Sequence, residues 1–182
     1  MAIVSYPPLR RIANSLFLGG TIDMGKARDW QSEAIELLKD TFSVIYNPRR
    51  SDWDPTWFQD LMNEKFKEQV DWELDMIEIA DWVLFNFEPD SYSPVTLLEL
   101  GSRIHRVVVV CPPKYFRKGN VDVFCVRHNI PVYTCLKDAV VFLKANVYEE
   151  LAGTYGPTAA KHSLYKSVYA DEDYDSMFGN ED

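Results

Sequence analysis

Glu99 is the first residue whose type and position suggest chemistry. It interrupts an apolar run, Val95-Thr96-Leu97-Leu98-Glu99-Leu100, at the start of a predicted helix. A carboxylate on a helix face that packs against a sheet is costly to bury unless it has a partner or a function. Thr96 shares the face of Glu99, and Ser93 is expected to cap the helix beneath a cleft. A salt-bridged glutamate and a catalytic glutamate fit this pattern equally well.

Glu73 is a second carboxylate within an apolar helical stripe, which Phe66, Val70 and Ile77 define. Helical rise puts Glu73 about 10 Å above one edge of the sheet and Glu99 about 9 Å below the other, across strands about 20 Å long. Both carboxyl groups are therefore expected near one level, and a strand order of 2-1-3-4-5 puts both helices on one face. Such a pair suits cleavage of an N-glycosidic bond: one group attacks or stabilises the anomeric carbon, and the other protonates the departing base.

The loop after the first predicted strand carries candidate ligand contacts, because ligands of open parallel sheets bind outside the carboxyl ends of the strands. Gly19 and Gly20 are followed by Asp23 in this loop. Paired glycines let a ligand approach the backbone closely, although they also serve simply to turn a chain. The segment lacks a GxGxxG pattern, so no dinucleotide cofactor is expected.

The loop after the second predicted strand contains Asn47, Arg49 and Arg50. Arginines beside a cleft bind phosphate in a bidentate manner, whereas arginines on a surface loop are more often solvated. Trp53 follows this loop and is the candidate platform for a nucleobase, with packing at the sheet edge as the alternative. We expect these side chains to contact a substrate.

The elements that position these residues are predicted by short apolar runs that alternate with segments of helical periodicity. The expected strands are Ser15 to Gly19, Phe42 to Asn47, Trp82 to Phe87, Arg106 to Cys111 and Pro131 to Thr134. The expected helices are Lys26 to Lys39, Pro55 to Ala80, Pro94 to His105 and Leu136 to Val147. This alternation predicts an α/β fold, namely a flavodoxin-like, doubly wound, five-stranded parallel sheet with helices on both faces.

The composition of the 182 residues predicts one domain, 1–152, and an acidic tail, 153–182, that is either disordered or docked on a neighbouring subunit. A net charge of −9 argues against a nucleic-acid partner and favours a small ligand of little charge. We find no membrane span or signal peptide and expect a soluble, cytoplasmic protein. The three cysteines and three histidines lack the spacing of metal ligands, so neither a metal nor another cofactor is expected.

Four short segments also carry a resemblance to a known family. They are Leu18-Gly19-Gly20, Asn47-Pro48-Arg49-Arg50, Gln69-Val70-Asp71-Trp72-Glu73 and Leu98-Glu99-Leu100-Gly101. In order and spacing they resemble a variant branch of the nucleoside 2-deoxyribosyltransferase family, and the similarity extends from about Leu16 to Val147. The resemblance implies a small-molecule nucleoside or nucleotide and a free nucleobase as partners.

The resemblance also implies a role for individual residues. The family glutamate in the Glu-Leu-Gly segment attacks the anomeric carbon to form a deoxyribosyl-enzyme, and Glu99 matches that position. By the same resemblance, Glu73 assists protonation of the base and Phe17 supports the nucleophile. Asn129 resembles an asparagine that an adjacent subunit contributes to hold the 5′ end of the sugar. A homo-oligomer with shared active sites is therefore expected.

Ser93 departs from the family pattern, in which an aspartate six residues before the nucleophile binds the sugar. A neutral serine tolerates a phosphate better than a carboxylate does, since two anions in a dry pocket repel each other. The expected activity is base exchange on a 2-deoxyribonucleoside through a covalent deoxyribosyl-glutamate intermediate. An N-glycosidase of nucleosides or nucleotides that uses the same glutamate, and a non-catalytic nucleotide sensor, are the alternatives.

Overall fold

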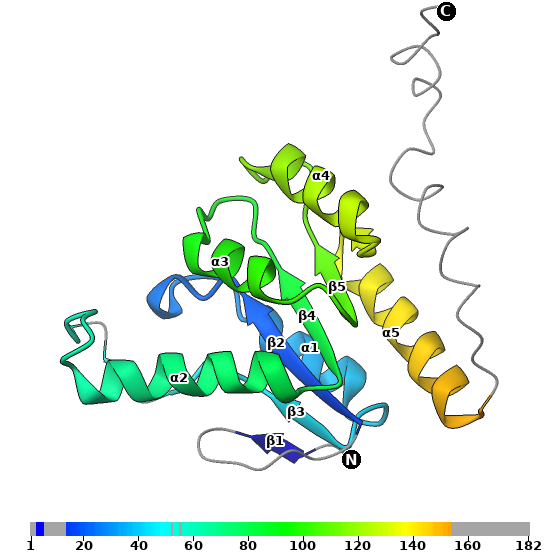
Figure 1. Cartoon of the computed structure of the whole chain (residues 1–182), viewed down its shortest axis with the longest axis horizontal. Helices are drawn as coiled ribbons and strands as arrows, with labels where there is room; N and C mark the ends of the chain where they lie inside the picture. The colour runs from blue at the N-terminus through cyan, green and yellow to red at the C-terminus, as the bar shows by residue number, and fades with distance from the viewer. Residues whose placement is uncertain (1–2, 6–13, 52, 55, 154–182) are drawn as a thin grey trace, which may run out of the picture.

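Parallel strands form one six-stranded sheet in the computed structural model, which describes residues 3–5, 14–51, 53–54 and 56–153 (Figure 1). The strands are β1 (Ile3–Ser5), β2 (Ser15–Gly20), β3 (Val44–Tyr46), β4 (Trp82–Asn86), β5 (Val107–Val110) and β6 (Val132–Tyr133). They lie in the order β1-β3-β2-β4-β5-β6. The five predicted strands and their order are confirmed. The short strand β1 pairs with β3 at the sheet edge and is too brief for the sequence pattern to predict.

Helices cover both faces of the sheet, as a doubly wound fold requires (Figure 1). One face packs against α2 (Glu64–Ile79), α3 (Pro94–Ser102) and α4 (Lys118–His128). The other face packs against α1 (Trp30–Leu38) and α5 (Leu136–Leu151). Residues of the central strands are apolar on both sides because both sides are covered, and all four valines of β5 are buried. The expected placement of α2 and α3 on one face is confirmed.

The start of α2 differs from the sequence prediction, which began this helix at residue 55. The helix begins at Glu64, and Asn63 caps it by accepting a hydrogen bond from a backbone N–H group. Ahead of it, the carboxylates of Asp54 and Asp60 each accept the N–H of the residue two positions later, at 2.9 Å in both cases. These local bonds stabilise turns in competition with a helix. The segment 56–63 is therefore a loop that precedes the helix.

Other helices also differ from the sequence prediction. The helix α1 begins at Trp30, four residues late, because the Asp29 side chain caps it there. The helix α4 is absent from the prediction, and only Val121 and Cys125 of its residues are buried. An apolar stripe this narrow gives a weak helical signal. The helix α3 starts at the predicted Pro94 but ends at Ser102.

The described part of the chain closes just after α5, at residue 153. The acidic tail predicted for 153–182 lies outside the described residues apart from its first position. Within the described ranges, no helix is long and apolar enough to cross a membrane. The same residues contain no group of three or more His, Cys, Asp or Glu side chains that could hold a metal ion.

Candidate active site

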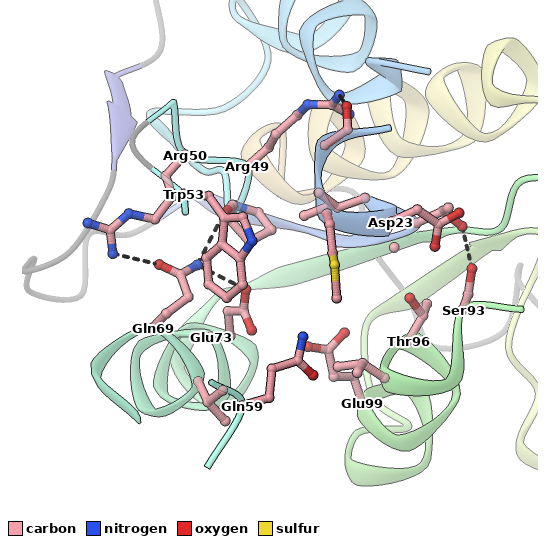
Figure 2. Close-up of a pocket in the computed structure, with 18 of the residues that line it drawn as sticks. Asp23, Arg49, Arg50, Trp53, Gln59, Gln69, Glu73, Ser93, Thr96 and Glu99 are labelled. Atoms are coloured by element: carbon pink, nitrogen blue, oxygen red, sulfur yellow. Dashed lines mark hydrogen bonds between the residues drawn. The ribbon is translucent and has the colours of Figure 1, made fainter. Parts of the chain in front are cut away.

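A pocket of about 540 Å³ lies between α2 and α3, beside the loops that follow β2, β3 and β4 (Figure 2). Most of the predicted site residues line it. They are Gly20, Asp23, Arg49, Arg50, Trp53, Glu73, Ser93, Thr96 and Glu99. The topology therefore brings together candidates that are far apart in the sequence, at the sheet edge where ligands of such folds bind.

Glu99 projects from α3 into this pocket (Figure 2). The residue is only 7% exposed, and among the described residues no group forms a hydrogen bond or ion pair with its carboxyl group. Burial raises the pKa of Glu99 to about 8, and the charge of Glu73 raises it as well. Within the described ranges no cation forms an ion pair with Glu99, so the structure offers no support for the salt-bridged alternative.

Glu73 faces the same pocket from α2 (Figure 2). Burial raises the pKa of Glu73 to about 7, while a hydrogen bond donated by Gln69 lowers it. The amide nitrogen of Gln69 lies 2.9 Å from Glu73 Oε1. Since both pKa values are near or above neutrality, the two carboxyl groups together retain at least one proton at neutral pH. One acid and one carboxylate are therefore available at the same time.

The paired glycines of the first loop are explained mainly by packing. A Cβ at Gly19 would lie 2.5 Å from the Phe85 ring, and a Cβ at Gly20 would lie 2.4 Å from the carbonyl oxygen of Asn86. Gly20 also has a φ of 148°, a conformation that other residues rarely adopt. Of the two, Gly20 lines the pocket and Gly19 does not. We expected a ligand to approach Gly19 closely, but the group that lies close to it is the Phe85 ring of the neighbouring strand β4.

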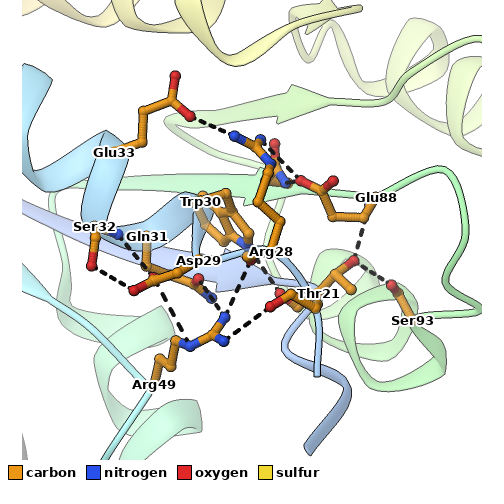
Figure 3. A network of polar contacts seen from close by, with 12 residues as sticks. Thr21, Arg28, Asp29, Trp30, Gln31, Ser32, Glu33, Arg49, Glu88 and Ser93 are labelled. Carbon is orange, nitrogen blue, oxygen red and sulfur yellow. Dashed lines mark hydrogen bonds and ion pairs between the residues drawn. The ribbon is translucent and has the colours of Figure 1, made fainter. Parts of the chain in front are cut away.

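Arg49 holds the first loop in place (Figure 3). Its guanidinium group donates hydrogen bonds to the backbone carbonyls of Gly25, Ala27 and Arg28 at 3.1, 3.0 and 3.2 Å. Its Nε also lies 3.9 Å from a carboxylate oxygen of Asp29. These contacts occupy the guanidinium N–H groups that would otherwise bind a phosphate, so the geometry indicates a structural role for Arg49.

Arg50 and Trp53 line the pocket from the second loop. Arg50 donates a hydrogen bond to Gln69 Oε1 at 3.2 Å and lies over the Trp57 ring, 5.8 Å from its centroid. Trp53 packs against Trp57 with ring centroids 5.1 Å apart. The Trp53 Nε1 donor is buried and has no hydrogen-bond partner among the described residues. Trp53 thus presents a ring and an unused donor at the pocket.

Ser93 begins α3 in a left-handed conformation, with a φ of 43°, but its side chain does not cap the helix as predicted. Its hydroxyl is hydrogen-bonded to the Thr21 hydroxyl at 2.5 Å and to the Ser91 hydroxyl at 2.9 Å. Ser91 in turn donates to a carboxylate oxygen of Asp23 at 2.9 Å. Ser93 is a neutral residue, but the Ser91 hydroxyl connects it by hydrogen bonds to the Asp23 carboxylate, which lines the pocket.

Three other predicted contacts lie outside the pocket lining. The Asn47 side chain accepts the backbone N–H of Arg49 at 3.0 Å and so shapes the turn after β3. Asn129 ends α4 with a φ of 55°, where asparagine is favoured. Phe17 is fully buried and packs on Trp72, with ring centroids 6.2 Å apart. The roles expected of Phe17 and Asn129 stay predictions.

Gln69, Thr21 and Ser91 are pocket or pocket-supporting residues that the sequence analysis does not select. Gln69 could have been selected, because it precedes Glu73 by four residues and so shares its helix face. The hydroxyls of Thr21 and Ser91 are both hydrogen-bonded to the Ser93 hydroxyl. Thr21 lies far from Ser93 in the sequence, and no local sequence pattern predicts such a contact.

The fold and the site together define a flavodoxin-like α/β protein with a carboxyl pair in a small-molecule pocket. Residues 13–115 match the family model described as nucleoside 2-deoxyribosyltransferase like, and the chain belongs to this family. The match covers more than half of the chain and includes both carboxyl groups, while Asn129 lies beyond it. No curated protein matches the sequence. The family indicates a glycosyltransferase-type enzyme that acts on nucleosides.

Proposed function

We propose that the protein exchanges the base of a 2-deoxyribonucleoside through a covalent deoxyribosyl-Glu99 intermediate. The observation that carries the proposal is a buried Glu99 carboxyl group with no partner among the described residues, facing Glu73 across one pocket. Buried ionisable groups without partners are rare outside functional sites, because burial disfavours their charged form.

The reaction follows from the two carboxyl groups. A carboxylate oxygen of Glu99 attacks C1′, the bond from C1′ to the base nitrogen breaks, and its electron pair leaves with the base. Glu73 gives its proton to the departing base nitrogen. A second base then attacks C1′, the ester bond to Glu99 breaks, and Glu73 takes up the proton that the incoming base releases. The enzyme returns to its starting state.

The proposed steps require one particular protonation state of the carboxyl pair. The productive arrangement has the proton on Glu73 and the charge on Glu99. In the empty pocket, pKa values of about 7 for Glu73 and about 8 for Glu99 favour the opposite arrangement, with the proton on Glu99. A bound base that accepts a hydrogen bond from Glu73, and a sugar carbon that becomes positive beside Glu99, both act against this preference.

The charges of the pocket support a nucleoside rather than a nucleotide as substrate. Asp23, Glu73 and Glu99 line it, and a phosphate would be repelled by these acidic groups whenever they are ionised. Both arginines of the lining are engaged, Arg49 with backbone carbonyls and Arg50 with Gln69. We therefore propose a neutral substrate.

Polar groups of the pocket lining suggest how this substrate is held. Trp53 offers its ring for stacking and its Nε1 for an acceptor on the base. Thr96 is 3% exposed and lies on the face of α3 that carries Glu99, and its hydroxyl has no hydrogen-bond partner among the described residues. Asp23 and Thr96 are the groups that we assign to the sugar hydroxyls.

We also propose that the active form is a homo-oligomer. Tyr92, Val95, Leu98 and Phe116 are large apolar side chains with exposed fractions of 74, 59, 73 and 49%. Such a patch on and beside one helix favours contact with another protein surface. Val95 also lines the pocket, so a second copy docked on this patch would border the site. A contribution of Asn129 from that copy remains part of the proposal.

A base-exchange assay tests the proposed function. The protein is incubated with a deoxynucleoside and a different free base, and the products are separated by chromatography. A new nucleoside is the expected product, and it should be lost in the Glu99→Ala variant. Free sugar without a new nucleoside would identify the N-glycosidase alternative, and no turnover of any deoxynucleoside would favour a nucleotide sensor.

A further inference from the structure

A chain of hydrogen bonds leads from Arg50 through Gln69 to Glu73 (Figure 2). Arg50 donates to Gln69 Oε1 at 3.2 Å, and Gln69 Nε2 donates to Glu73 Oε1 at 2.9 Å. The same Gln69 nitrogen donates to the backbone carbonyl of Pro48 at 3.1 Å. Gln69 is 3% exposed, so its amide has little access to water.

The surroundings allow only one orientation of the Gln69 amide. A guanidinium group has donors and no acceptor, so the oxygen of the amide must face Arg50. The two N–H groups then face Pro48 O and Glu73 Oε1, which are both acceptors. A flipped amide would place its N–H groups against the Arg50 donors and its oxygen against the Pro48 and Glu73 oxygens, which leaves buried polar groups without hydrogen bonds and is unfavourable.

We propose that Arg50 and Gln69 are positioning residues that reserve Oε1 of Glu73 as an acceptor, so that its transferable proton resides on Oε2. This inference rests on the proposed function, since it gives the proton of the general acid a fixed place. No donor among the described residues reaches Oε2. The proton on Oε2 is thus free to meet a base nitrogen in the pocket.

The influence of Arg50 on Glu73 runs through Gln69 rather than through direct attraction. The pKa of Glu73 responds to burial and to the Gln69 hydrogen bond. The other charged groups that line the pocket are Asp23, Arg49 and Glu99. Removing Arg50 frees the amide to flip, and protonated Glu73 can then donate from its Oε1 to the Gln69 oxygen. The proton would be held on the wrong oxygen.

The experiment compares Arg50→Met with Arg50→Lys, which keeps a donor for Gln69. Lys65→Met is a matched control, because Lys65 is exposed and lies over the same Trp57 ring as Arg50, 5.5 Å from its centroid. Two quantities are measured: the pKa of Glu73 in the free protein by carbon-13 NMR, and the pH profiles of kcat and KM for base exchange. Gln69→Met, alone and combined with Arg50→Met, completes a double-mutant cycle.

For Arg50→Met we expect a higher pKa for Glu73, an alkaline limb of kcat/KM moved to higher pH, and kcat reduced about tenfold with KM within about twofold. Arg50→Lys should restore most of kcat, and Lys65→Met should match the wild type. In the Gln69→Met background, Arg50→Met should add nothing. If Gln69→Met does not fold, the Arg50 and Lys65 variants decide the question.

Additive effects in the cycle would overturn the inference, since they would mean that Arg50 acts by its charge alone. A raised KM with unchanged kcat in Arg50→Met would also overturn it, because Arg50 would then contact the substrate. The proposed function fails separately, by the absence of exchange in the wild-type protein. The NMR measurement does not depend on turnover, so the two failures are distinguishable.

Discussion

At the scale of single residues, Glu99 and Glu73 differ in what surrounds them. Gln69 donates a hydrogen bond to Glu73, whereas no group among the described residues does so for Glu99. A carboxylate without donors is a stronger nucleophile than one held by hydrogen bonds, and a protonated carboxyl group with one oxygen held in place is a well-positioned acid. This difference supports the assignment of Glu99 as nucleophile and Glu73 as acid.

The two roles predict different dependence on the leaving base. Glu99→Gln should lower kcat/KM by at least about 10³-fold for every substrate, because no ester can form. Glu73→Gln should lower it by about 10²- to 10³-fold for an ordinary base, but by much less for an electron-poor base that departs without a proton. Steady-state kinetics with a series of bases tests this. Equal losses for all bases in Glu73→Gln would contradict the acid role.

The same carboxyl groups should make stability depend on pH. Their pKa values of about 7 and about 8 exceed the ordinary value of 4.5, so the folded protein binds more protons than the unfolded chain between these values. The free energy of unfolding should therefore fall as pH rises through this window. Glu99→Gln should match the wild type near about pH 5 and be more stable by about 2–4 kcal/mol near about pH 9. Urea unfolding at both pH values measures this, and a constant difference would refute the burial of an unpaired Glu99 carboxyl group.

The sequence predicts the carboxyl pair well and the loop residues poorly, for a physical reason. A glutamate inside an apolar helical stripe is conspicuous because the helix repeat alone implies its burial. Arg49 carries no such signal, since its partners are backbone carbonyls of another loop. Ser93 carries no such signal either: the sequence predicts a helix cap, whereas its hydroxyl contacts Thr21 and Ser91.

At the scale of elements, the first loop is shaped by its contacts with the second. Arg49 fixes carbonyl groups of residues 25, 27 and 28, and Asp23 at the start of this loop lines the pocket. The wall of the pocket therefore depends on one side chain from outside the loop.

Arg49→Met should destabilise the protein by about 1–3 kcal/mol, because the loop carbonyls lose a donor. It should also raise KM for a deoxynucleoside more than it lowers kcat, since Asp23 would no longer be held in place. Thermal unfolding and steady-state kinetics check both effects. An unchanged stability, together with a specific loss of affinity for deoxynucleotides, would instead mean that Arg49 binds phosphate.

The central strands are predictable because both of their faces are buried, which makes them continuous apolar runs. The start of α2 is not predictable in this way. Whether the chain before Glu64 forms turns or a helix depends on hydrogen bonds that the side chains of Asp54 and Asp60 accept from nearby backbone N–H groups. The helix α4 is not predicted because only two of its residues, Val121 and Cys125, are buried, which gives a weak apolar pattern in the sequence. Elements with a wide buried face are thus the ones that the sequence determines most clearly.

At the scale of the whole molecule, the exposed apolar patch of α3 borders the pocket. If a second copy completes the site with Asn129, chains that lack different site residues should complement each other. Asn129→Ala and Glu99→Ala should each be nearly inactive, and a mixture exchanged under mild denaturation should regain part of the activity. Light scattering and the base-exchange assay measure assembly and activity. A monomer, or full activity of Asn129→Ala, would contradict shared sites.

The most direct test of the central claim is mass spectrometry of the protein after incubation with a 2-fluoro-substituted nucleoside, which slows breakdown of a glycosyl-enzyme. We predict that the peptide containing Glu99 gains the mass of the fluorinated sugar, that a free base removes it, and that Glu99→Gln gains nothing. An active protein with no adduct on Glu99, or with the adduct on another residue, would contradict the account.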